Sequence, residues 1–244
     1  MSSSYAFLSC LLPSLPEELG EEMPIPFDQI AGMVRRNIEA DDYPLLEAYL
    51  LSIDVSNFES LALGKGTFDE GGMLAYEDIQ DKKKLPLFIK DFLDEQEKGI
   101  NRRYVYDRLW ELYYVHTHSL AMELGCAYLT QYIPWEVGLR NVLVTLRMRK
   151  RNEEPADYMM LTDFGKFDFS SVIAKVGEGQ NPLLIERYLD EARLRYIFHC
   201  EGSDPFSFDA ILAYLARSMV YDRWAKMNSP YDLNTFFDSV GVQV

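Results

Sequence analysis

The stretch Trp135–Arg151, with the sequence WEVGLRNVLVTLRMRKR, organises the rest of the chain. Its apolar residues recur at helical spacing and form one buried stripe of Trp135, Leu139, Val142, Leu143 and Leu146. On the opposite side Glu136 precedes Arg140 by four residues, which is the favourable order for an ion pair on a helix. Asn152, two glutamates and Pro155 then end the pattern. We therefore expect an amphipathic helix that buries the tryptophan side.

The end of this stretch is the one dense basic cluster in a chain of formal net charge -15. It holds Arg147, Arg149, Lys150 and Arg151, where positive charge also complements the carbonyl end of a helix. Two interpretations stay open: a solvated helix end, or a contact patch for an acidic partner. In the second case the partner-binding residues are Arg140 and the four residues of the cluster.

Composition limits the classes of protein that fit. A chain of 244 residues with 48% hydrophobic and 26% charged residues is typical of a globular protein with one large domain or two small ones. We expect a single helical domain over 1–244, divisible into units 1–100, 101–170 and 171–244. The acidic balance argues against nucleic acid as a partner. Three scattered cysteines favour a reducing cytoplasm, and no apolar run is long enough to span a membrane.

Helical periodicity recurs through most of the chain, so the sequence predicts an all-α, multi-helix array with little or no strand. The expected helices are a short one in 85–94, a long one over 102–130, one over 182–200 and a last long one that Ser207 caps. Tyr5–Leu12 fits a strand or a short helix, and helices also follow Phe27 and Asp42. A short terminal helix is expected over Tyr231–Val240.

Several details of these helices are also predictions. Within 102–130 the expected buried seam includes His116, while His118 diverges from it, so the two make a poor metal pair. Gly125 is expected at a close approach of a neighbouring helix. In 182–200 we expect Leu183 and Leu184 to face inward and Asp190 to face outward with the arginines.

Motifs that carry chemistry give no positive signal. Gly64–Gly72 lacks the glycine and hydroxyl positions of a phosphate loop, so a flexible connector is the expectation. The three histidines have no recognisable metal-ligand spacing. We therefore expect no cofactor, no metal and no enzymatic activity. A hydrolase or metal enzyme that gathers His116 or His199 with carboxylates stays open as an alternative.

Three segments share a weak outline, in which an acid comes early in a helix and basic residues come at its end. They are Leu46–Lys65, Trp135–Arg151 and Phe208–Lys226. Spacing of roughly eighty residues is what stacked helical units produce.

The central segment resembles a known signature. Glu136, Arg140-Asn141, Leu146-Arg147 and Lys150 resemble the Glu-x-x-x-Asn-Leu-x-x-x-Leu-Arg-x-Lys pattern of the V-type ATPase C/d family, the rotor-seat proteins of these enzymes. The start of the chain looks more like a bacterial subfamily encoded among V-type ATPase genes, through Tyr5-Ala-Phe-Leu, Leu15-Pro16 and Pro26-Phe27. The chain departs from the pattern in its third segment, where Arg223-Trp224 stands in place of an Asn-Leu-Arg run.

The resemblance implies a non-catalytic helical funnel that supports ion transport coupled to ATP. Its partners would be the central-stalk and proteolipid-ring subunits of a bacterial V-type ATPase. Its location would be the cytoplasm, or peripherally the cytoplasmic face of the inner membrane. The alternative is a free-standing helical scaffold or regulatory protein without enzymatic activity.

Overall fold

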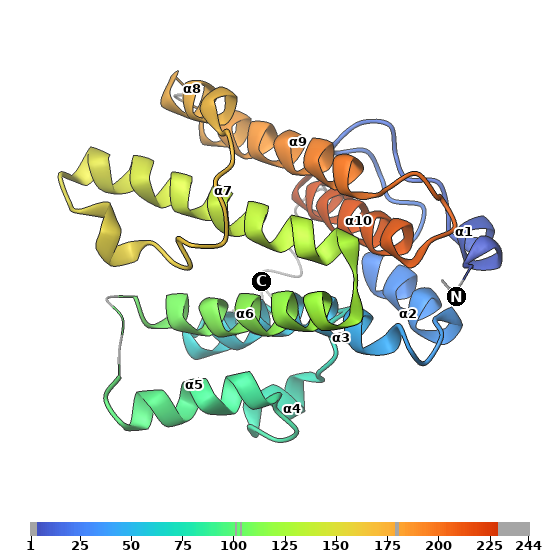
Figure 1. Cartoon of the computed structure of the whole chain (residues 1–244), viewed down its shortest axis with the longest axis horizontal. Helices are drawn as coiled ribbons and strands as arrows, with labels where there is room; N and C mark the ends of the chain where they lie inside the picture. The colour runs from blue at the N-terminus through green and yellow to red at the C-terminus, as the bar shows by residue number, and fades with distance from the viewer. Residues whose placement is uncertain (1–3, 101, 103, 179–180, 229–244) are drawn as a thin grey trace, which may run out of the picture.

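The regular elements are helices throughout the part of the chain that the computed structural model describes, residues 4–100, 102, 104–178 and 181–228 (Figure 1). The helices are α1 Ala6–Leu11, α2 Phe27–Asn37, α3 Tyr43–Ala62, α4 Tyr76–Gln80, α5 Leu87–Glu97, α6 Val105–Leu124, α7 Ala127–Arg151, α8 Ser170–Glu178, α9 Pro182–Cys200 and α10 Phe208–Asn228. A 3-10 turn covers Pro155–Tyr158. The predicted all-α class is confirmed.

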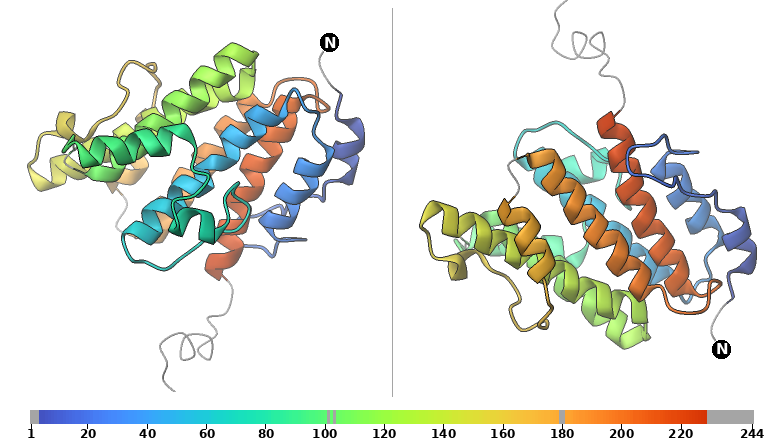
Figure 2. Two further views of the ribbon diagram at one scale, coloured as in Figure 1. Left: turned by 90° about the horizontal axis from the view of Figure 1, so that it is seen from below. Right: turned by 90° about the horizontal axis from the view of Figure 1, so that it is seen from above.

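Three long helices, α3, α7 and α10, begin at regular intervals, and we call them the repeat helices. Their first residues, Tyr43, Ala127 and Phe208, lie 84 and 81 residues apart. The helix that precedes each repeat helix packs on the repeat helix before it: α6 on α3, α9 on α7, and α2 on the last one, α10. Figure 2 shows α9, α10 and α2 side by side. The packing therefore closes on itself, with the first helices beside the last.

Each repeat helix carries a buried polar residue 14 positions after its first residue, namely Asn57, Asn141 and Asp222. Asn57 donates to the carbonyl of Asp69 at 2.9 Å and accepts from its N–H at 2.7 Å. Asn141 forms the same pair of bonds with Met160, at 2.7 and 3.0 Å. Asp222 accepts from the N–H of Phe27 at 3.2 Å. These three backbone-binding residues fix the neighbouring segments, because a buried amide group must find a partner.

The positions that are equivalent in the three repeat helices are not those that the sequence comparison of the three segments aligned. The asparagines of the first two segments are equivalent, but the acids are not. Glu47 is exposed, Glu136 pairs with Arg193, and Asp209 accepts from the N–H of Tyr128 at the start of α7. Only Glu47 is exposed, so the three acids do not share one environment, whereas the two buried asparagines make the same pair of backbone hydrogen bonds.

The core has one large cluster around α2, α3, α5, α6 and α10, and a smaller one between α7, α8 and α9. Trp135 and Leu139 lie in the smaller cluster, with Val142, Leu143 and Leu146 packed against it. The predicted stripe of α7 is therefore confirmed. Tyr132 and Tyr196 contact both clusters and join them.

Helix ends were predicted well in some places and wrongly in others. α9 has the expected bounds, α7 ends at Arg151, and Ser207 accepts from the N–H of Ala210 at the start of α10. α7 begins eight residues before Trp135, however, and runs through Pro134. Burial of Tyr128, Leu129 and Ile133 compensates for the backbone bond that a proline removes. Tyr231–Val240 lies outside the described residues.

The buried seam of α6 differs from the predicted one. It runs through Leu109, Tyr113, Thr117 and Ala121, and His116 is exposed against the ring of Phe88. Gly125 marks no close approach, because a Cβ there would meet nothing within 4 Å. Its φ of 74° instead ends α6 in the left-handed conformation that glycine adopts easily.

The glycine-rich segment after α3 is bound at several points and is not a free connector. Besides the Asn57 contact with Asp69, the carboxylate of Asp54 accepts from the N–H groups of Met73 and Leu74 at 2.7 and 3.0 Å. Arg35 donates to the carbonyls of Gly71 and Gly72. A Cβ at Gly72 would lie 2.2 Å from an Asp54 oxygen, so the contact requires glycine there. The short helix α4, which periodicity did not predict, follows directly.

Candidate functional site

The basic cluster lies at the exposed end of α7. Arg147, Arg149, Lys150 and Arg151 are all exposed, and none of them forms an ion pair with another of the described residues. Asn152 closes the helix at φ 55°, and the N–H of Glu153 bonds back to the carbonyl of Met148 at 3.0 Å. The helix end is therefore closed by backbone hydrogen bonds, while its four cations are exposed.

Arg140 is not part of this exposed cluster. Its guanidinium bonds to Asp107 at 3.1 Å and lies over the ring of Trp110 at 5.3 Å. Burial opposes the charge of Arg140, but Tyr114 and Asp107 beside it hold its pKa above the usual value. The expected pair of Glu136 and Arg140 is wrong, because the neighbouring helices offer each a less exposed partner. Arg140 therefore joins α7 to α6.

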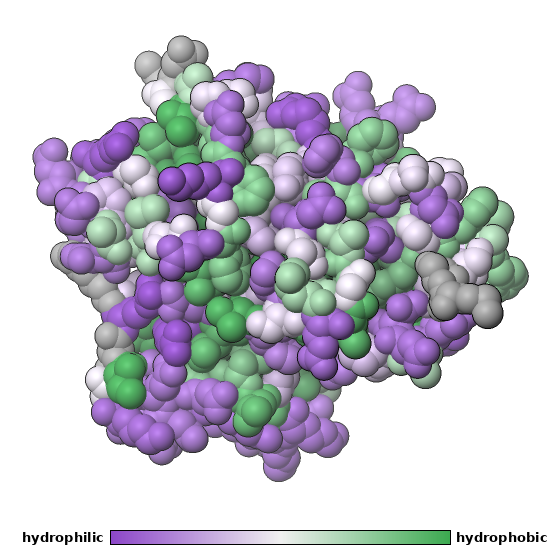
Figure 3. All heavy atoms as spheres, in the orientation of Figure 1, coloured by the Kyte–Doolittle hydropathy of each residue, from purple (hydrophilic) through white to green (hydrophobic). Residues whose placement is uncertain are grey.

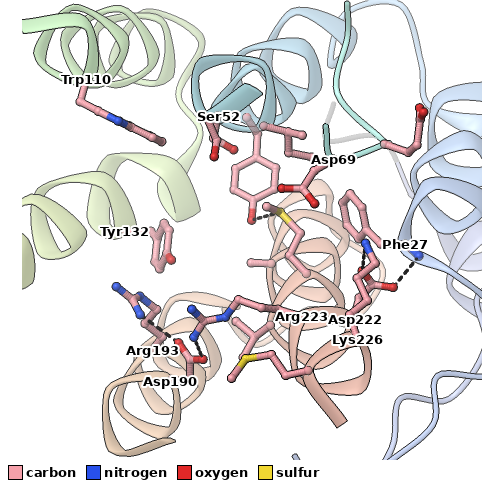
Figure 4. A pocket seen from close by; sticks show the side chains of 18 residues that line it. Phe27, Ser52, Asp69, Trp110, Tyr132, Asp190, Arg193, Asp222, Arg223 and Lys226 are labelled. Atoms are coloured by element: carbon pink, nitrogen blue, oxygen red, sulfur yellow. Dashed lines mark hydrogen bonds and ion pairs between the residues drawn. The ribbon is translucent and has the colours of Figure 1, made fainter. Parts of the chain in front are cut away.

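A partly open cavity of about 660 Å³ lies between the repeat helices α3 and α10 and the sides of α6, α7 and α9 (Figure 4). Tyr49, Ser52 and Ser56 of α3 line one wall, and α10 lines the opposite wall from Ala216 to Met227. Trp110 and Tyr132 point toward the cavity from α6 and α7. The glycine-rich segment contributes Asp69 and Glu70 at the edge. The volume is in the range of small-molecule pockets.

Asp190 is the centre of the polar side of this cavity. It is 1% exposed and accepts from Arg193 at 2.9 Å, from the indole N–H of Trp224 at 2.7 Å, and from Arg223. Arg193 bonds in addition to both carboxylate oxygens of Glu136, with the shortest contact 2.9 Å. The prediction that Asp190 faces outward is wrong: α10 covers this side of α9 and supplies the two extra donors.

Sequence reasoning missed this network, although one signal was present. Asp190 and Arg193 are spaced by three residues, so they share a helix face, and each directly follows a buried residue, Leu189 or Ala192. Burial opposes the charge of Arg193, yet Glu136 beside it holds the pKa of the guanidinium well above its usual value. The guanidinium of Arg193 therefore keeps its charge at neutral pH, and its contacts join α7, α9 and α10.

The aromatic side of the cavity is also held by polar contacts. The indole N–H of Trp110 donates to Glu59 at 2.8 Å, and the Tyr49 hydroxyl lies 3.4 Å from the sulfur of Met219. Burial, with the nearby Glu136 charge, raises the pKa of Tyr132 well above its usual value. The phenols of Tyr49 and Tyr132 are neutral, so the cavity wall consists of aromatic rings beside arginines that are paired with carboxylates. Aromatic and arginine side chains are also the residues that contribute most to binding at protein interfaces.

The histidines do not come together. His116 stacks on Phe88 with ring centroids 5.3 Å apart, and His118 contacts Phe164 at 4.9 Å. Within the described residues no three metal-ligand side chains are grouped. All three cysteines are free, and burial raises the pKa of Cys200 to about 11, so that this thiol is protonated at neutral pH.

Comparison with known proteins gives one match. Residues 1–176, which include α1 to α7 and most of α8, match the family described as protein of unknown function (DUF2764). The chain belongs to the DUF2764 family. No curated protein and no solved structure matches it. Among the described residues of this DUF2764 protein, none of the helices combines the length and the apolarity needed to cross a bilayer.

Proposed function

We propose that this DUF2764 protein is a non-catalytic accessory component of a bacterial V-type rotary ATPase. It would act as an adaptor between the central stalk and the proteolipid ring, on the cytoplasmic side. The observation that carries the proposal is the set of three repeat helices with a buried polar residue at the same position in each. A closed array of such units around a cavity is what the resemblance to the C/d family leads us to expect.

The residues of the C/d-like signature divide into two groups in the structure. Glu136 and Asn141 are turned to the interior, where they bind Arg193 and the backbone of Met160. Arg147 and Lys150 are exposed at the end of α7. The first group holds the units together, and the second group is available to a partner. This division supports a structural role for the signature.

An adaptor that transmits torque has to resist deformation, and the interior contacts supply that resistance. Asp190 joins α9 to α10, Glu136 joins α7 to α9, and Arg140 joins α7 to α6. Because ion pairs that are largely shielded from water are costly to break, these contacts oppose relative movement of the helices that they join.

Affinity purification of the tagged protein from its native membranes tests the proposal. We expect rotary ATPase subunits among the recovered proteins, in amounts that fall when Arg147, Lys150 and Arg151 are all changed to glutamate. The control changes Lys82, Lys83 and Lys84 to glutamate; these are exposed cations in the segment before α5, where Lys83 pairs with Asp81 and Lys84 with Asp78. Recovery without any rotary ATPase subunit would refute the proposal. If ATPase coupling is unaffected in the folded triple variant, the free-standing scaffold becomes the better interpretation.

A further inference from the structure

One end of the molecule combines exposed cations with exposed apolar side chains. The end of α7, helix α8 and the start of α9 lie together there, and α8 packs against both neighbours (Figures 1 and 2). Hydrophobic residues reach the surface among hydrophilic ones over this region (Figure 3). The apolar side chains are Ile173, 41% exposed, Leu183, 50% exposed, and Leu184, 49% exposed.

The exposure of the two leucines follows from how α8 and α9 pack. α8 turns Val172 and Val176 into the small core cluster, where they meet Leu189 and Ala192 of α9. Asn181 caps α9 by accepting from the N–H of Leu183 at 3.0 Å, which fixes the first turn. That first turn lies beyond the part of α9 that the neighbouring helices cover, so Leu183 and Leu184 are exposed. The expectation that Leu183 and Leu184 face inward is therefore wrong.

We propose that this end docks an acidic amphipathic helix of a partner protein. We call it the docking end, and it consists of Arg147, Arg149, Lys150, Arg151, Ile173, Leu183 and Leu184. Arg147 and Arg151 are four residues apart on α7 and meet carboxylates spaced by one helical turn. The three apolar side chains meet the apolar stripe of the same helix. This inference deepens the proposed function by giving the chemistry of the partner surface, and it rests on that proposal for the partner's identity.

Charge favours a protein partner over a lipid surface. The chain has a formal net charge of -15, so an anionic bilayer repels most of the molecule. Glu154 and Asp157 are exposed just beyond the cluster and reduce the positive field that headgroups would meet. A helix can place its carboxylates on the arginines and avoid these two acids, whereas a bilayer surface cannot.

A designed peptide tests the docking end directly. The probe is a labelled helical peptide of about 18 residues, or five turns, with glutamates along one side and leucines along the other. A second peptide keeps the glutamates and replaces the leucines with alanine. Both are titrated against the whole protein, against the triple variant Arg147→Glu, Lys150→Glu, Arg151→Glu, and against Leu183→Ser, Leu184→Ser. The Lys82, Lys83 and Lys84 glutamate variant is the control, and circular dichroism confirms that each variant is folded.

We expect saturable binding of the leucine peptide that weakens at least about tenfold in the triple variant and at raised salt. The serine variant should bind both peptides equally, because the leucine contribution then has no partner. The proposal is overturned if the charge reversal has no effect, or if the leucine and alanine peptides bind the natural protein alike. A third result would also overturn the proposal: the peptide does not bind, while vesicles of phosphatidylglycerol and phosphatidylcholine bind the natural protein but not the triple variant. Peptide binding without recovery of ATPase subunits would refute the proposed function and leave the docking end intact.

Discussion

Asn141→Ala should be among the most destabilising single changes in α7. The side chain of Asn141 is 7% exposed, and Met160, whose backbone it binds, is 1% exposed. Alanine would leave the N–H and the carbonyl of Met160 without partners where water does not reach. An unpaired buried polar group costs about 1–3 kcal/mol, so two of them lower the free energy of unfolding by about 2–6 kcal/mol.

Asn57→Ala is the matched comparison, because Asn57 makes the same two bonds in the first repeat helix. Its target Asp69 is exposed, so water can replace the lost amide group. We expect a cost of only about 0.5–1.5 kcal/mol, the net value of an ordinary hydrogen bond. The difference between the two variants comes from the burial of the bound backbone, since the truncation is identical.

Urea unfolding followed by circular dichroism and tryptophan fluorescence measures both variants. With an unchanged slope, the Asn141→Ala midpoint should fall by about 1 M or more, and the Asn57→Ala midpoint by less than half of that. The argument is refuted if Asn141→Ala costs less than about 1 kcal/mol, or no more than Asn57→Ala.

Three further predictions concern other buried contacts. Asp190→Ala removes the shared acceptor of Arg193, Arg223 and Trp224 and should lower the free energy of unfolding in urea by about 3–5 kcal/mol. The control is Glu186→Gln, at a half-exposed acid 3.6 Å from Arg223, which should lower it by less than about 0.5 kcal/mol. Gly72→Ala should lower the melting temperature because the new methyl group meets Asp54, while Gly177→Ala, in open space on α8, should stabilise by about 0.5–1 kcal/mol. Burial raises the pKa of the Asp54 carboxyl from 3.8 to about 6, so its protonated form favours folding below about pH 4, and this contribution is lost as the pH rises through 6. The free energy of unfolding, relative to Asp54→Asn at each pH, should therefore fall by up to about 3 kcal/mol between about pH 4 and 7, and a flat difference would contradict this.

The sequence was sufficient where one residue type and one period decide the structure. Pro182 marks the start of α9, and the spacing of Trp135, Leu139 and Leu146 defines the buried side of α7. The boundary at Pro134 failed because tertiary packing outweighs the local preference of a single proline. Local patterns of this kind report on one helix at a time.

The polar interior could not be predicted for a different reason. Whether Asp190 faces water or the interior depends on α10, which supplies Arg223 and Trp224 from more than thirty residues away. The same holds for Arg140, whose partner Asp107 belongs to the preceding helix. For the docking end, the sequence located the four cations, but it wrongly placed Leu183 and Leu184 in the core. Helical periodicity does not show that α8 leaves the first turn of α9 uncovered.

The packing of α2 on α10 has a consequence for synthesis on the ribosome. Phe27, at the start of α2, bonds to Asp222, and Tyr5 bonds through its N–H to the carbonyl of Phe206. The surface on which the amino-terminal helices rest is thus translated long after these helices themselves. Until α10 has been translated, the apolar side chains of α1 and α2 lack the surface that α10 provides. This interval is when a chaperone would be of most use to the chain.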